Sequence, residues 1–144
     1  MESLTYFISG HIDLEEEEFN QYYKPFLDLA IQDSESRFVM GDATGADTLA
    51  REYLSSKIDI KRITIYTVKN PKKVKEPLNK FPIKGSFNNH EEKDKAMTLA
   101  SDLDIAYIRS PEEQKKRLEA RGIEYNPNRK SGTEKNLLRR KEII

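Results

Sequence analysis

The chain of 144 residues has 25 Lys and Arg, 25 Asp and Glu, and no Cys, so its formal net charge is zero. The lack of Cys excludes a disulfide framework, a thiolate nucleophile and a Cys-based zinc site. No apolar run is long enough to cross a bilayer, and the first ten residues lack the basic start of a signal peptide. We therefore expect one cytoplasmic domain covering residues 1–144, with no membrane partner.

The charges are distributed unevenly along the chain. Residues 1–56 contain 3 Lys and Arg against 12 Asp and Glu, a net of −9, and residues 57–144 contain 22 against 13, a net of +9. We expect these halves to pair within the molecule or between subunits. Nucleic acid is a possible but less favoured partner, because the basic residues are interleaved with acids instead of forming a clean stripe.

The first half predicts two strands and two or three helices. Residues 4–10 form a short apolar run closed by glycine, which is typical of a buried strand. Apolar residues at helical spacing predict a helix over 14–32, with Asp13 as its N-cap; at Pro25 the helix either kinks or a second one begins. A second strand over 37–41 and a helix over 46–56 follow.

The second half continues the alternation. We predict strands over 62–68 and 103–109, and helices over 91–102 and 131–143. Between them lie a long Lys- and Pro-rich loop at 69–90, with room for a short strand, and a charged insertion at 110–130 with a short surface helix. The pattern predicts an α/β fold: a Rossmann-like, mostly parallel sheet with helices on both faces, in a single domain.

Three turns carry the candidate binding residues, because ligands of such sheets gather beyond the carboxyl ends of the strands. The candidates are Ser9, Gly10 and His11 in the first turn; Gly41, Asp42, Ala43, Thr44, Gly45 and Asp47 in the second; and Ser131, Gly132, Thr133 and Asn136 in the third.

The second turn contains two aspartates that cannot both face a phosphate. We expect one of Asp42 and Asp47 to cap the following helix and the other to accept hydroxyl groups of a sugar, although capping alone explains at least one of them. In the third turn, Ser131 and Glu134 also fit a capping box. His11 is a candidate general acid, stacking ring or phosphate donor, whereas we expect His90 to be exposed. We expect no metal and no cofactor.

Taken together, "FISGHID", "FVMGDATGADTLAREYL", "KGSFNNHEEKDKAMTLASDLDIAYIR" and "SGTEKNLLRR" resemble the SLOG superfamily of Rossmann-like proteins, which includes the LOG phosphoribohydrolases and the DprA proteins. Lys93 and Asp94 stand where relatives usually carry an Arg-Asp helix start. The resemblance implies a nucleotide or nucleotide-derived ligand at the three turns. It also implies self-association into a homo-oligomer.

One departure from the LOG pattern bears on catalysis. LOG enzymes carry PGGxGTxxE, and the position of the glutamate is Asn136 here. A glycosidase needs a carboxylate at the anomeric carbon, and the remaining candidates are Asp42, Asp47, Asp94 and Glu134. We therefore favour a nucleotide-binding protein over an N-glycosidase, phosphoribohydrolase or deoxyribosyltransferase.

Further expectations follow from the binding hypothesis. The base would stack on Tyr66, Phe87 or His11, and Asp47→Ala or Gly45→Val would weaken nucleotide affinity more than it lowers the melting temperature. A weaker alternative is a contact with DNA through the Lys-rich loop at 69–84.

Overall fold

The computed structural model describes residues 3–143 and contains one five-stranded, all-parallel sheet. Its strands are β1 (Thr5–Ser9), β2 (Arg37–Met40), β3 (Ile63–Tyr66), β4 (Ile83–Lys84) and β5 (Leu103–Ala106), in the order β4-β3-β2-β1-β5. The predicted α/β class and the parallel sheet are thus confirmed, and the short strand expected within the 69–90 loop is β4.

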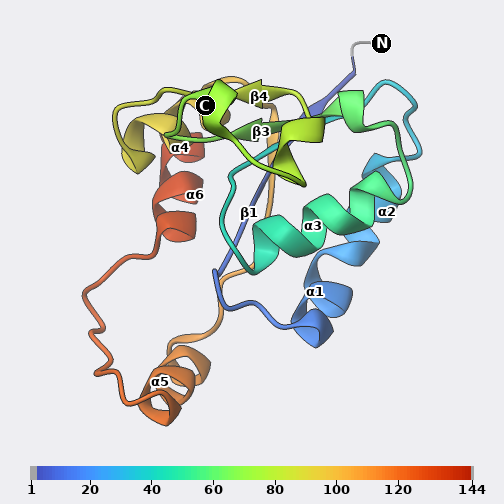
Figure 1. Ribbon diagram of the computed structural model, residues 1–144. Helices are drawn as coiled ribbons and strands as arrows, with labels where there is room; N and C mark the ends of the chain where they lie inside the picture. The colour runs from blue at the N-terminus through green and yellow to red at the C-terminus, as the bar shows by residue number, and fades with distance from the viewer. Residues whose placement is uncertain (1–2, 144) are drawn as a thin grey trace.

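The strands are buried on both faces because helices cover both. The helices are α1 (Glu16–Tyr22), α2 (Lys24–Ala30), α3 (Ala46–Ser55), α4 (His90–Leu99), α5 (Pro111–Ala120) and α6 (Gly132–Ile143). Figure 1 shows α1, α2 and α3 gathered on one side of the sheet and α4 and α6 on the other.

Alternation of side chains along the strands explains these two layers. Ile8 of β1 and Met40 of β2 are register partners and belong to the larger core under α1–α3. Their neighbours Phe7 and Val39 point to the opposite face, where they pack with Met97 of α4. The strands β1, β2 and β3 thus contribute to both cores, as expected for a parallel sheet covered on both faces.

The first helical segment differs from its prediction in one respect. Pro25 begins a second helix, α2, which is one of the two predicted outcomes. The prediction of Asp13 as N-cap is wrong: Glu15 is the N-cap of α1 and forms a capping box with Glu18. Asp13 instead accepts a hydrogen bond from Arg109 Nη1 at 2.8 Å, a contact between residues far apart in the sequence.

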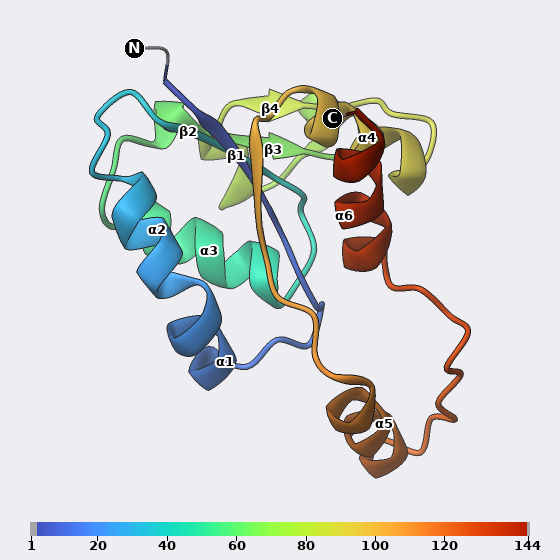
Figure 2. The same cartoon turned by 180° about the vertical axis from the view of Figure 1, so that it is seen from behind.

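The charged insertion, together with Arg109 directly before it, is attached to the acidic first half by ion pairs. Arg109 is buried and binds both Asp13 and Glu18 at 2.8 Å, and Arg117 of α5 binds Glu15 at 2.7 Å. Figure 2 shows α5 at the end of the molecule opposite the N-terminus, away from the sheet. The opposite net charges of the two halves are therefore used at least partly for pairing within the molecule.

Among residues 3–143, no helix has both the length and the apolar composition needed to cross a membrane.

Candidate functional site

The first two predicted turns are joined to each other by the main chain. Gly45 is the N-cap of α3 and has φ of 72°. A Cβ atom at this position would collide with the main chain of His11 and Ile12. Thr44 donates its hydroxyl to Ile12 O at 2.9 Å, and Ala46 N donates to His11 O at 3.1 Å. Gly45 is therefore required for the packing of one turn on the other, whether or not a ligand approaches it.

The crevice between β1 and β5 is bridged by the protein's own groups. From β1 the chain adds β2, β3 and β4 on one side and β5 on the other, so the strand order reverses between β1 and β5, and ligands often bind at such a point. Here Tyr23 donates its hydroxyl to Ser9 O at 2.7 Å and accepts from Tyr107 N at 3.0 Å. Gly10 leaves the room for that hydroxyl, because a Cβ at this position would collide with it. On the side of Tyr23, the switch point is thus closed by a side chain from α1–α2.

His11 also closes this crevice. Its Nε2 atom accepts a hydrogen bond from Arg109 N at 3.0 Å, which places the ring proton of a neutral imidazole on Nδ1. Burial and the nearby charge of Arg109 both lower the pKa of His11. A neutral histidine with one nitrogen already occupied fits a structural role better than the predicted role of general acid.

The two aspartates of the second turn have different environments. Asp47 is half-buried, and its Oδ2 atom accepts from Ala43 N at 3.3 Å, inside its own turn. Asp42 reaches the residue directly after β3, where its Oδ2 atom accepts from the hydroxyl of Thr67 at 2.7 Å. Neither carboxylate caps α3. The N-cap residue of this helix is Gly45, and no side chain forms a capping hydrogen bond there.

Lys93 lies at the centre of the charges at this edge. This lysine of α4 is buried, and its Nζ atom lies 4.0 Å from a carboxylate oxygen of Asp42 and 4.0 Å from one of Asp94. It also donates to His90 Nδ1 at 3.2 Å, so His90 is held at the start of α4 although it is exposed as predicted.

One positive charge thus stands among several carboxyl groups. Burial raises the pKa of Asp47 to about 7, and the charges of Asp94 and Asp42 add to that effect while Lys93 opposes it. The pKa of Asp94 is also raised, mainly by burial. Among residues 3–143, no group of three or more His, Asp or Glu side chains is arranged to hold a metal ion.

The third predicted turn has the capping geometry. Glu134 N donates to Ser131 Oγ at 3.2 Å, and the Ser131 hydroxyl lies 3.5 Å from the Glu134 carboxylate. Thr133 and Asn136 are buried, and Asn136 accepts from Arg139 at 2.6 Å. These groups fix the start of α6 and line neither of the two best-defined cavities.

Arg140 positions the whole of α6. Its guanidinium binds both carboxylate oxygens of Asp104 in β5, at 3.2 and 3.1 Å. It also donates to Thr98 O at 3.1 Å and to Ser101 O at 2.7 Å, at the end of α4. The third turn is therefore held at the sheet edge by Arg140, a buried residue of the same segment that was not among the candidate site residues.

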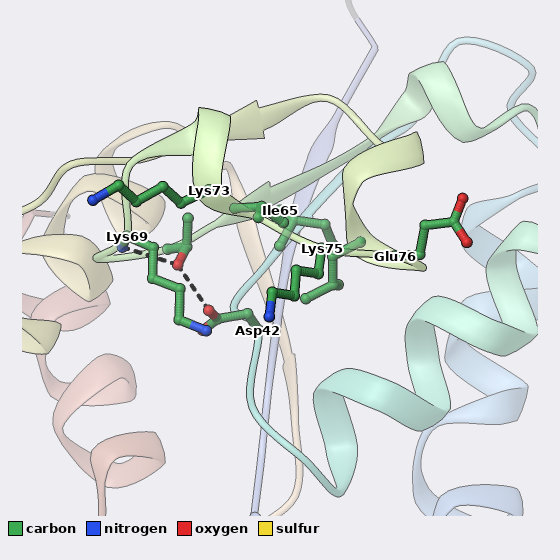
Figure 3. A pocket seen from close by; sticks show the side chains of 9 residues that line it. Asp42, Ile65, Lys69, Lys73, Lys75 and Glu76 are labelled. Atoms are coloured by element: carbon green, nitrogen blue, oxygen red, sulfur yellow. Dashed lines mark hydrogen bonds between the residues drawn. The ribbon is translucent and has the colours of Figure 1, made fainter.

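A cavity lies beside the second turn and beyond the end of β3. It has a volume of about 310 Å³ and contains one of the predicted site residues, Asp42. The other lining residues are Ile65, Thr67, Lys69, Lys73, Val74, Lys75, Glu76 and Leu78. Figure 3 shows the amines of Lys69 and Lys75 directed toward Asp42, whereas Lys73 extends in another direction and Glu76 points away.

The structure thus brings together some of the predicted site residues and assigns others to packing. Asp42, Asp47 and Asp94 come together around Lys93, and the first turn packs against the second. Tyr66 is buried against Phe87, with ring centroids 5.8 Å apart, so its face is used for packing and not for a base. Sequence reasoning did not select Thr67, because the predicted strand over 62–68 includes it; in the structure β3 ends at Tyr66, which places Thr67 at the carboxyl end of the strand.

A comparison of the chain with protein-family models, curated proteins and solved structures found no match.

Proposed function

We propose that the protein binds a nucleotide or nucleotide-derived ligand at the carboxyl edge of its sheet, with Asp42 as an acceptor for ligand hydroxyl groups. The observation that carries this proposal is the cavity with Asp42 in its wall. Asp42 Oδ2 is held by Thr67, and no donor lies within hydrogen-bond distance of Oδ1 in the described part of the chain, since Lys93 is 4.0 Å away. A fixed carboxylate with a free oxygen is suited to a sugar diol.

The size and lining of the cavity support a ligand of modest size. About 310 Å³ is near the lower end of the range for small-molecule pockets, roughly 300–1,000 Å³. This volume favours a mononucleotide or a part of one over a dinucleotide. Ile65, Val74 and Leu78 give the cavity an apolar portion, which a base or sugar face would cover.

The resemblance to the SLOG superfamily supports the same ligand class, and membership of that superfamily is part of the proposal. So is self-association. β5 pairs only with β1 among the described strands, so one of its edges is open, and open strand edges are common sites of pairing between chains. Light scattering on the purified protein would measure the oligomeric state.

The alternative function is cleavage or transfer at an N-glycosidic bond. It is favoured by one observation: of the four candidate carboxylates, Asp42 lines the cavity, beside an aspartate with a raised pKa. In this alternative Asp42 would stabilise or attack the anomeric carbon, and protonated Asp47 would be available as an acid.

One experiment separates the two functions. The protein is incubated with nucleosides, mononucleotides, cyclic dinucleotides and NAD-derived metabolites, bound and free fractions are separated by filtration, and both are resolved by chromatography. We expect one ligand to be depleted and recovered intact. Release of free base or ribose phosphate would establish the enzyme instead, and an unchanged panel would refute both.

A further inference from the structure

The cavity beside Asp42 is also lined by lysines, which the first two glycine-rich turns lack. Three of its nine lining residues are lysines, against two acids, so its formal charge is +3 −2 = +1. Glu76 and Lys73 both extend away from Asp42 in Figure 3, so the inward-facing charges are the amines of Lys69 and Lys75 against the carboxylate of Asp42, and the net charge stays positive.

The Lys-rich segment is held in place by main-chain contacts. Lys69 N donates to Thr67 Oγ1 at 3.1 Å, and Lys69 O accepts from Ser86 N at 2.8 Å, so this residue is fixed between the ends of β3 and β4. Asn70 accepts from Lys72 N through its side chain at 3.0 Å and from Lys73 N through its carbonyl at 2.9 Å. Together with the packing of Leu78 on the main core, these bonds position the lysines at the cavity.

The glycine-rich turns offer the opposite environment. Asp42 and Asp47 both project from the second turn. The pKa of half-buried Asp47 is raised, mainly by burial, so a negative charge is already poorly stabilised there. A phosphate at the start of α3 would add negative charge beside them. The start of α6 is occupied by its own capping groups, Ser131 and Glu134. Neither helix start is therefore suited to an anion.

We propose that the cavity lined by Lys69, Lys73 and Lys75 is a phosphate-binding subsite, and that the ligand is phosphorylated. This inference rests on the proposed function. It assigns the two ends of the ligand: the hydroxyl groups face Asp42, and the phosphate lies among the lysines. Lysine ammonium groups bind phosphate through charge-assisted hydrogen bonds. The neighbouring carboxylate then orients the ligand, because it repels the phosphate and attracts hydroxyl donors.

The test uses inorganic phosphate, ribose 5-phosphate, adenosine and adenosine 5′-monophosphate, titrated into ¹⁵N-labelled protein. We expect phosphate and both phosphorylated compounds to shift the amide signals of Thr67 and of residues 69–78. Shifts confined to residues 41–45 or 131–136 would overturn the proposal, because they would place the anion at the helix starts.

Two charge-matched double variants give the control. Lys69→Gln with Lys75→Gln removes two lining charges, whereas Lys72→Gln with Lys80→Gln removes two exposed charges outside the cavity. Loss of a charged hydrogen-bond partner lowers affinity by about tenfold or more. We therefore expect the first variant to lose at least about tenfold in phosphate affinity and the control less than about twofold.

The outcomes also separate this inference from the proposed function. Equal binding of adenosine and its monophosphate, unaffected by the lining variant, would overturn the subsite and leave nucleotide binding intact. Binding of a single-stranded oligonucleotide in preference to the mononucleotide, weakened equally by both variants, would also overturn it and indicate a diffuse nucleic-acid surface.

Discussion

Replacement of Asp47 by Asn tests whether this half-buried aspartate is protonated in the folded protein. In the unfolded chain the carboxyl has its ordinary pKa of 3.8, and in the folded protein burial raises the pKa to about 7. Below pH 4 the Asp47 carboxyl is protonated in both the folded and the unfolded state. The stabilities of the wild type and of Asp47→Asn should therefore depend on pH in the same way there. Between pH 4 and 7 only the folded state holds this proton, so the stability of the wild type falls as pH rises.

The magnitude follows from the size of the shift. Each pKa unit corresponds to about 1.36 kcal/mol, so a shift of about three units amounts to about 4 kcal/mol once the pH is above 7. Asn does not titrate and keeps an oxygen that can accept from Ala43 N. The variant should therefore gain about 4 kcal/mol in unfolding free energy relative to the wild type between pH 4 and pH 8.

Urea unfolding at pH values from 4 to 8.5 measures this difference directly. Glu124→Gln, in the exposed loop after α5, removes one carboxylate as a control and should show no such rise. A difference between wild type and Asp47→Asn that stays constant with pH would refute the reasoning, because it would mean that Asp47 is ionised in the folded protein.

Three further predictions concern the scaffold of the site. Gly45→Ala should destabilise the fold by more than about 2 kcal/mol, because both its φ of 72° and the nearby His11 and Ile12 main chain oppose a Cβ. Gly122→Ala is the control, because this glycine has φ of 73° but open space around it. Equal losses in melting temperature for Gly45→Ala and Gly122→Ala would contradict the collision of a Cβ at residue 45 with the main chain. Arg140→Gln should cost about 3–5 kcal/mol, since it leaves Asp104 buried without its partner; in denaturant unfolding, a loss no larger than that of the exposed Lys141→Gln would contradict this. The hydrogen bonds from Arg109 hold the pKa of Glu18 at about 2, against 4.5 for an ordinary glutamate. The stability that this pair contributes, about 3 kcal/mol, is present above pH 4.5 and lost as pH falls toward 2, so acid unfolding of Glu18→Gln should lack that part of the pH dependence, and superimposable acid transitions would show that the pair contributes nothing.

The layer order of this fold could be predicted from local patterns. Short apolar runs closed by Gly10 and Gly41 alternate with helical spacing, and that alternation is enough for a parallel sheet. The role of Asp13 could not be predicted, because its partner Arg109 lies far along the chain and only the folded structure brings them together. The N-cap is Glu15, which forms a capping box with Glu18 and which the usual N-cap preferences do not select.

The candidate site was predictable only in part, for a similar reason. The first two turns follow strands, as Gly10 and Gly41 indicated, whereas the third turn begins α6 after a long loop and does not follow a strand. The cavity itself joins Asp42, from the connection between β2 and α3, with Thr67 and the 69–78 segment, from the connection between β3 and β4, and the two connections share no motif. The closure of the β1–β5 crevice depends on Tyr23, a residue that its sequence pattern assigns simply to the apolar face of a helix. The expectation for Gly45→Val changes as well: the structure makes this residue part of the packing, so a loss of melting temperature should dominate.

The most direct test of the account is the affinity of Asp42→Asn for adenosine 5′-monophosphate, measured by calorimetry beside the wild type and Asp47→Asn. Asp42 is assigned to the ligand and Asp47 to the fold. Loss of a charged acceptor costs about 1.5–3 kcal/mol, so the account predicts an affinity lower by about 10- to 100-fold for Asp42→Asn and a change of less than about threefold for Asp47→Asn at pH 6, where Asp47 is already protonated. Unchanged affinity in a folded Asp42→Asn protein would contradict the central claim that this carboxylate faces the ligand.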